Sequence, residues 1–288
     1  MIQHQVVIGG VRTPVYDSAE QGSEAVVFVH GNPGTGDDWL PLIAEIAPFA
    51  RCLAPDMPGF GTADKPADFN YTVAGYAAHL DALLAGRGVT RAHLVLHDFG
   101  GPWGLAWAAA QAEQVASITL INIGLMRGYR WHYAARIWRT PLLGELFQAI
   151  TTRAGFRLAL RHGNPRGLPD AFVERMIRNY DRATRRAVLK LYRATDALDA
   201  AAEAVHAALR PRDLDCLVLW GKCDPYVPWR FAEQQRETFP RAELAYFEDS
   251  GHWPFIDNPT AVAAVLVPFL RRVTAHSPAH SRPSTPPS

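Results

Sequence analysis

Long hydrophobic runs, cysteines and an excess of either charge are all scarce in this sequence of 288 residues. No apolar run reaches the roughly 18 residues that a membrane-spanning helix needs. Residues 1–10 have neither the basic region nor the long apolar stretch of a secretory signal. With 29 Lys and Arg against 28 Asp and Glu, the net charge is +1, which gives no bulk field to recruit nucleic acid or an anionic membrane.

The three cysteines, Cys52, Cys216 and Cys223, show no paired spacing, which argues against a disulfide framework. No cluster of His, Cys and Glu has zinc spacing, and no glycine-rich phosphate loop follows a strand-like run. We therefore expect a cytoplasmic protein, monomeric or homodimeric, that binds no metal, cofactor, nucleic acid or membrane.

What the chain does have is a hydrophobic share of 48%, which is enough for a sizeable core. Residues 25–30 (AVVFVH) form a continuous apolar run, the pattern of a strand that is buried on both faces of a parallel sheet. Similar runs occur at residues 52–54, 93–96, 117–121, 216–220 and 244–247. Helical patterns alternate with them, so the sequence predicts an α/β fold with a mostly parallel central sheet and helices on both faces.

The alternation breaks between residues 125 and 210, where the periodicity is helical and no strand pattern is convincing. We predict a core made of residues 1–124 and 211–275, and a helical cap, or lid, at 125–210. The cap would cover the carboxyl edge of the sheet, which carries the ligand site in open α/β sheets. Residues 276–288 are rich in Ser and Pro and are predicted to be disordered.

The most informative motif is centred on Asp98. An apolar strand pattern runs into His97 and Asp98, and Phe99 and two glycines then open a helical pattern. This is the layout of a nucleophile elbow, a sharp turn that raises one side chain above the sheet. Ser or Cys would occupy the position of Asp98 in an esterase or protease. We expect His97 to pack or hydrogen-bond behind the elbow.

Three further motifs follow strand patterns. His30-Gly31-Asn32 comes after the first apolar run and can aim backbone N–H groups at an oxyanion, with the N–H of Phe99 as partner. Asp224 and His252 each lie in a loop just past a later strand. The chain order of nucleophile, acid and histidine is the order of the α/β-hydrolase elbow motif.

These motifs resemble those of a known family. Residues 20–125 and 211–272 look like the α/β-hydrolase fold, and the His-Asp-aromatic-Gly-Gly elbow resembles that of epoxide hydrolases and haloalkane dehalogenases. The segments 56–61 (DMPGFG) and 64–66 (DKP) are similar to a loop of both families. The resemblance implies Asp98 as nucleophile, His252 as base and Asp224 as its carboxylate partner.

A carboxylate nucleophile suits displacement at an sp³ carbon, which forms an alkyl-enzyme ester on Asp98. His252 would then activate the water that hydrolyses this ester, while Asp224 orients the imidazole. Two leaving groups fit this chemistry. The oxygen of an epoxide needs a proton donor as the ring opens, whereas a halide needs N–H donors.

The resemblance implies different leaving-group residues in the two cases. Epoxide hydrolases use two cap tyrosines, for which Tyr192 and Tyr133 are the candidates, with Tyr129 as the alternative to Tyr133. Dehalogenases use a tryptophan after the nucleophile together with an asparagine or a cap tryptophan. Asn32 matches that asparagine, but Phe99 has no N–H to donate.

The first interpretation is therefore an epoxide hydrolase that forms a vicinal diol. Haloalkane dehalogenase is the alternative, and a catalytically inactive ligand-binding member of the fold is a remote one. The abundance of tryptophan favours a small hydrophobic substrate. His30, Trp138 and Trp253 are predicted to line its pocket.

Overall fold

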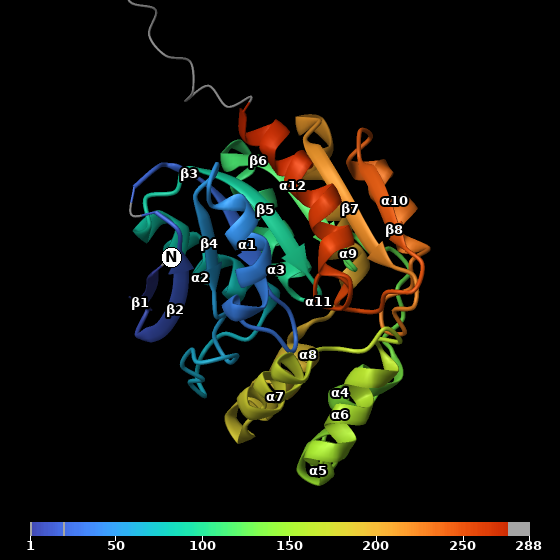
Figure 1. The fold of residues 1–288 in the computed structure, drawn as a ribbon. Coiled ribbons are helices and arrows are strands. Elements are labelled where there is room, and N and C mark those ends of the chain that lie inside the picture. The colour runs from blue at the N-terminus through green and yellow to red at the C-terminus, as the bar shows by residue number, and fades with distance from the viewer. Residues whose placement is uncertain (1, 20, 276–288) are drawn as a thin grey trace, which may run out of the picture.

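A computed structural model describes residues 2–19 and 21–275 (Figure 1). The predicted disorder of residues 276–288 lies outside the described residues. Within these residues, eight strands form one sheet in the order β1-β2-β4-β3-β5-β6-β7-β8. Their bounds are β1 Ile2–Ile8, β2 Val11–Asp17, β3 Glu24–Val29, β4 Cys52–Pro55, β5 Arg91–His97, β6 Val115–Ile121, β7 Asp215–Gly221 and β8 Glu243–Phe247.

Strands β3 to β8 run parallel, while the β1–β2 hairpin joins the sheet antiparallel to β4. The central strands are buried on both faces, as their continuous apolar runs predict. In β3, successive side chains enter different cores: Val27 and Val29 belong to one hydrophobic cluster, and Val26 and Phe28 to the other. The predicted α/β architecture is confirmed.

Helices cover both faces of the sheet. One face packs against α1 (Leu40–Ile46) and α12 (Pro259–Ala275), and the other against α2 (Val73–Gly86) and α3 (Gly100–Ala110). Two further core helices are α10 (Phe231–Thr238) and α11 (Pro254–Asp257). Short 3₁₀ turns lie at Gly36–Trp39, Ala112–Gln114 and Arg210–Arg212. None of the described helices is long and apolar enough to cross a membrane.

Six helices separate β6 from β7. They are α4 Tyr133–Arg139, α5 Leu143–Ile150, α6 Arg153–His162, α7 Asp170–Asn179, α8 Arg182–Ala194 and α9 Leu198–Leu209. Figure 1 shows α4 to α8 beyond the ends of the strands. By contrast, α9 packs on α3, and its Ala202, Val205 and Leu209 belong to the core. The predicted cap boundary at residue 210 stays a prediction, because α9 packs on a core helix while α8 and α9 both bury residues in the same hydrophobic cluster.

A buried ion cluster joins the hairpin to the rest of the core. The Asp17 carboxylate, at the end of β2, is fully buried between the guanidinium groups of Arg51, 2.7 Å away, and Arg87, 2.6 Å away. Burial opposes ionisation of Asp17, but the hydrogen bonds from the two arginines keep its pKa below the usual value. A buried charge that loses its partner destabilises a fold strongly.

We expect Asp17→Ala to lower the free energy of unfolding by about 3–5 kcal/mol, because it leaves Arg51 buried without its carboxylate. Urea denaturation would measure the change. The control is Glu113→Ala, which breaks an exposed pair with Arg212 and should cost less than about 1 kcal/mol. Equal losses in the two variants would contradict this account.

Candidate active site

The nucleophile elbow is a sharp turn from β5 into α3. Asp98 has a φ of +48°, a left-handed conformation that a non-glycine residue rarely adopts and that recurs at functional sites. Gly100 is required by close approach, since a Cβ there would lie 2.2 Å from the carbonyl oxygen of Val29. The turn therefore presents the Asp98 carboxylate at the carboxyl edge of the sheet.

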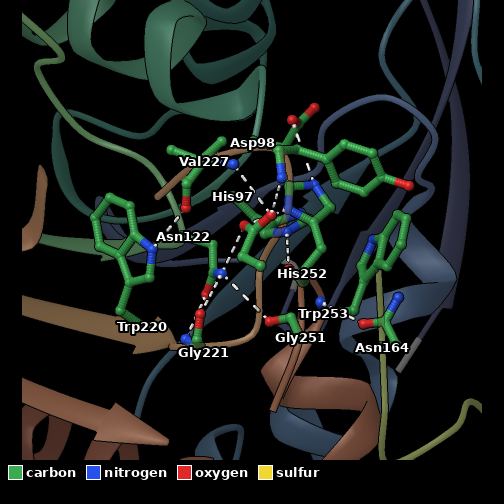
Figure 2. Close-up of polar contacts among 12 residues, drawn as sticks. His97, Asp98, Asn122, Asn164, Trp220, Gly221, Val227, Gly251, His252 and Trp253 are labelled. Carbon is green, nitrogen blue, oxygen red and sulfur yellow. Dashed lines mark hydrogen bonds and ion pairs between the residues drawn. The ribbon is translucent and has the colours of Figure 1, made fainter. Parts of the chain in front are cut away.

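Asp98, Asp224 and His252 meet at that edge. The Asp224 Oδ2 atom lies 2.7 Å from His252 Nδ1. On the other side of the ring, Asp98 Oδ2 lies 3.4 Å from His252 Nε2, and Figure 2 labels both of these residues. Asp98 follows β5, Asp224 follows β7 and His252 follows β8. The imidazole thus lies between the two carboxylates, as the chain order of the motifs led us to expect.

The second oxygen of Asp98 faces the loop after β3. The backbone N–H of Asn32 donates to Asp98 Oδ1 at 2.7 Å. Gly31 allows this approach, since a Cβ there would lie 2.3 Å from the same oxygen. The N–H of Asn32 is therefore in position to stabilise an oxyanion formed on the carboxyl group of Asp98.

Charge is distributed unevenly across the three groups. Burial opposes the ionised form of Asp98, but the hydrogen bond and charge of His252 lower its pKa to about 2. Burial also opposes the imidazolium, yet Asp224 and Asp98 together raise the pKa of His252 to about 10. The resting site therefore holds an imidazolium between two carboxylates. This charge adds most stability below about pH 6.5, and the contribution is lost as pH rises toward 10.

Asn122, which the sequence analysis missed, holds Asp224 in place. It directly follows β6 with a φ of +50°, and its Nδ2 donates to Asp224 Oδ2 at 2.7 Å. The other oxygen, Oδ1, accepts from the N–H groups of Tyr226 at 2.8 Å and Val227 at 3.1 Å. Asp224 is thus surrounded by donors. The available signal was a polar residue just after a buried strand at the same sheet edge.

The loop that carries His252 is held from two sides. Behind the elbow, His97 Nε2 lies 2.8 Å from the backbone oxygen of His252, and burial lowers the pKa of His97 to about 3, so it donates as a neutral imidazole. From the cap, Gly163 O accepts from the N–H of His252 at 2.9 Å, and Asn164 Oδ1 accepts from that of Trp253 at 3.1 Å. Figure 2 shows His97 and Asn164 beside this loop.

A cavity of about 290 Å³ opens above the nucleophile, between the core and the cap. Asp98, Asn32 and His252 line it together with the predicted Trp138 and Trp253. His30 does not line it, so that prediction is wrong. Its Nε2 accepts from the N–H of Met57 at 2.9 Å and its Nδ1 lies 2.9 Å from Gly31 O, which turns the ring into the loop that it supports.

The cap tyrosines differ in where their hydroxyls lie. Tyr192, on α8, is buried, and its hydroxyl oxygen accepts from Asn32 Nδ2 at 3.3 Å. Tyr133 borders the cavity with 54% of its surface exposed. Tyr129 donates its hydroxyl to the backbone oxygen of Tyr226 at 3.0 Å. Of these three candidates, Tyr192 alone has its hydroxyl beside Asn32.

A second cavity of about 30 Å³ adjoins the first. Phe99 lines it, with its ring 4.9 Å from that of Tyr192 between centroids. Four residues line both cavities: Asp98, His132, Tyr192 and Tyr226. His132 and Tyr226 were not identified from sequence. Among the described residues, no group of three or more His, Cys, Asp or Glu could hold a metal ion.

Comparisons with known proteins identify the family and relatives of this chain. The family model described as "alpha/beta hydrolase fold" matches residues 24–259. A haloalkane dehalogenase of Bradyrhizobium diazoefficiens is 27% identical over 91% of this chain and 92% of its own length. A cis-3-alkyl-4-alkyloxetan-2-one decarboxylase of Xanthomonas campestris pv. campestris is 27% identical over 91% of this chain and 93% of its own.

Solved structures show the same likeness. The haloalkane dehalogenase DbeA of Bradyrhizobium elkani superimposes with a TM-score of 0.82 and 25% identity, over 96% of this chain and 99% of that one. The chain belongs to the α/β-hydrolase fold family and is a hydrolase. The predicted resemblance to the dehalogenase and epoxide hydrolase branch is confirmed.

The raised pKa of His252 depends on two carboxylates, which gives a direct test. Asp98→Asn removes one negative charge, and we expect the pKa of His252 to fall by about 1–3 units from its value near 10. NMR titration of the imidazole would measure the fall. The control Glu113→Ala, at a remote exposed site, should leave this pKa in place. An unchanged pKa in Asp98→Asn would contradict the assigned ion pair.

Proposed function

We propose that this hydrolase displaces a leaving group from an sp³ carbon and forms an alkyl ester on Asp98, which water then hydrolyses. The observation that supports this proposal is a carboxylate at the elbow, in hydrogen-bond contact with Asn32 N–H and facing His252. A carboxylate would gain little by attacking an ester or amide carbonyl, since the anhydride formed is less stable than the substrate. Displacement at a saturated carbon gives a stable ester instead.

In the first step an oxygen of Asp98 attacks the carbon, and the leaving group departs with the electron pair. Because the pKa of Asp98 is about 2, the nucleophile is ionised at any working pH. The neighbouring imidazolium of His252 and the N–H of Asn32 hold the carboxylate in position. The cavity beside the nucleophile is mostly apolar, which suits a hydrophobic substrate.

In the second step water attacks the carboxyl carbon of the ester. Esterification removes the charge of Asp98, so the pKa of His252 falls and the imidazole becomes a competent base. Asp224 keeps the proton on Nδ1, which leaves Nε2 to accept one from water. The oxyanion forms on the Asp98 carboxyl group beside the N–H of Asn32. As it collapses, the bond to the alkyl oxygen breaks and His252 returns its proton to that oxygen, which releases the alcohol.

For the leaving group we place a halide first, and the substrate class is then a haloalkane. The similarity to haloalkane dehalogenases over nearly the whole chain supports this choice. Two N–H donors near the cavity also support it. Asn32 Nδ2 lies beside Tyr192, and Trp138, a cavity-lining residue, has an Nε1 that is buried without a partner among the described residues.

An epoxide is the second candidate, and Tyr192 is the observation that favours it. Its hydroxyl oxygen accepts from Asn32, which leaves its own proton free for an oxygen leaving group. Phe99 also supplies no side-chain N–H for a halide. A second tyrosine that could donate a proton is harder to identify, because the hydroxyl of Tyr129 already donates to the backbone oxygen of Tyr226.

The two-step chemistry is tested by trapping the ester. Glutamine cannot act as a base, so His252→Gln should react once and stall, with turnover reduced by about 10²–10⁴-fold. Mass spectrometry should show one substrate-sized adduct on the peptide that contains Asp98. The double variant Asp98→Asn/His252→Gln should show none. Full turnover by His252→Gln, or an adduct elsewhere, would overturn the mechanism.

The leaving group is identified by a pair of single variants. If a halide leaves, Asn32→Ala should slow halide release by about 10²–10³-fold, the usual effect of removing one donor, while Tyr192→Phe changes it little. If an epoxide opens, Tyr192→Phe should reduce diol formation by the same factor. A panel of matched haloalkanes and epoxides, read by halide and diol release, gives the measurement. An oxetan-2-one belongs in the panel because of the Xanthomonas relative.

A further inference from the structure

His132 lies at the start of α4, in the wall that separates the two cavities and contains Asp98 and Tyr192. Its ring centroid is 5.2 Å from that of Tyr226 and 6.1 Å from that of Tyr192. The ring of Tyr226 in turn lies 5.2 Å from that of His252. His132 therefore belongs to the group of rings around the reacting centre, although the steps above give it no role.

The hydrogen bond that begins α4 determines which ring nitrogen of His132 carries the proton. The N–H of Ala135 donates to His132 Nδ1 at 3.3 Å, so Nδ1 is an acceptor and serves as the N-cap of the helix. Burial lowers the pKa of His132 to about 4, which keeps the imidazole neutral near pH 7. In a neutral imidazole with Nδ1 accepting, the proton lies on Nε2.

The Nε2–H of His132 has no hydrogen-bond partner among the described residues. His132 itself lines both cavities, so this N–H lies at the boundary of the space beside Asp98. The site thus presents an unused N–H donor near Asp98. Phe99, which follows the nucleophile, cannot supply such a donor from its side chain.

We propose that His132 is a catalytic residue whose Nε2–H donates a hydrogen bond to the departing group as its bond to carbon breaks. This inference rests on the proposed displacement at an sp³ carbon. As the bond between Asp98 and the carbon forms, the leaving group takes the electron pair and accepts the hydrogen bond, and His132 keeps its proton. A neutral N–H that is already oriented by its helix stabilises the developing charge without reorganisation.

The two nitrogens of His132 can be tested separately, because the amide nitrogen of glutamine reaches about as far as Nε2 and the side chain of asparagine about as far as Nδ1. His132→Asn keeps an N-cap acceptor for Ala135 and loses the donor. His132→Gln keeps a donor and weakens the cap. If the donor matters, the Asn variant is the slower enzyme, and if the cap matters, the Gln variant is the less active.

The readout is the rate of each chemical step, measured by rapid quench with chloro-, bromo- and iodoalkanes of one chain length and with the matching epoxide. In the His252→Gln background, we expect His132→Asn to slow ester formation by about 10–100-fold with a chloroalkane and by clearly less with the iodoalkane, a better leaving group. His132→Gln should stay within about threefold of its parent. With His252 intact, hydrolysis of the preformed ester should proceed at the parental rate in both variants.

Equal slowing of ester formation and ester hydrolysis, equal slowing for chloride and iodide, or a slower Gln than Asn variant would overturn the role of His132. If an epoxide is the substrate, the role would be overturned by equal slowing of ring opening and ester hydrolysis, or by a Gln variant that is slower than the Asn variant. These outcomes leave the proposed function standing, because they require an active enzyme. Absence of any ester on Asp98 in His252→Gln, with every substrate of the panel, would instead overturn the proposed function and this inference with it.

Discussion

The ion pair between one imidazole and two carboxylates is the interaction on which the site depends. Burial by itself would leave His252 neutral, but Asp224 at 2.7 Å and Asp98 at 3.4 Å reverse that preference. The two carboxylates must therefore come from different strands that end at the same edge. Parallel strands β5 and β7, separated by β6, meet this requirement, and the loop that follows β8 carries the histidine. The parallel topology of the sheet is thus a condition for the electrostatics.

Holding these charges in a buried place requires neutral donors around them. Asn122 donates to Asp224 from the end of β6, and His97 donates to the backbone of His252 from behind the elbow. The cap contributes as well, since Gly163 and Asn164 accept hydrogen bonds from the histidine loop. The cap therefore holds the backbone of the base in position in addition to covering the cavity. Displacement of α6 would move the acceptors of this loop.

Sequence predicted the parts of the site that local signals specify. Asp98 lies between an apolar run and two glycines, and such a turn can be recognised without knowledge of the fold. For Asn122 the local signal was only a polar residue after a buried strand, and its role depends on Asp224, which is 102 residues away along the chain. The direction of the His30 ring was also misjudged, because it depends on the N–H of Met57, a long-range contact.

The cap shows the same limit of local signals. Helix α9 has the helical pattern of its neighbours in the insertion, and this pattern does not reveal that the helix packs on α3. Tyr133 and Tyr192 were both sequence candidates, but one is half exposed and the other is buried beside Asn32. The face that a cap helix turns to the cavity is set by tertiary contacts.

These differences have a chemical consequence. The nucleophile, its base and the oxyanion donor all come from the core, where topology determines their positions, so ester formation and hydrolysis share one geometry whatever leaves. In the proposed mechanism the leaving group instead faces side chains such as Tyr192 and His132, which the cap supplies. Since Phe99 offers no donor from the elbow itself, the choice between halide and oxygen falls on cap residues and Asn32. In the proposed mechanism the reaction type thus depends on residues of the core, and the choice of substrate depends on residues of the cap.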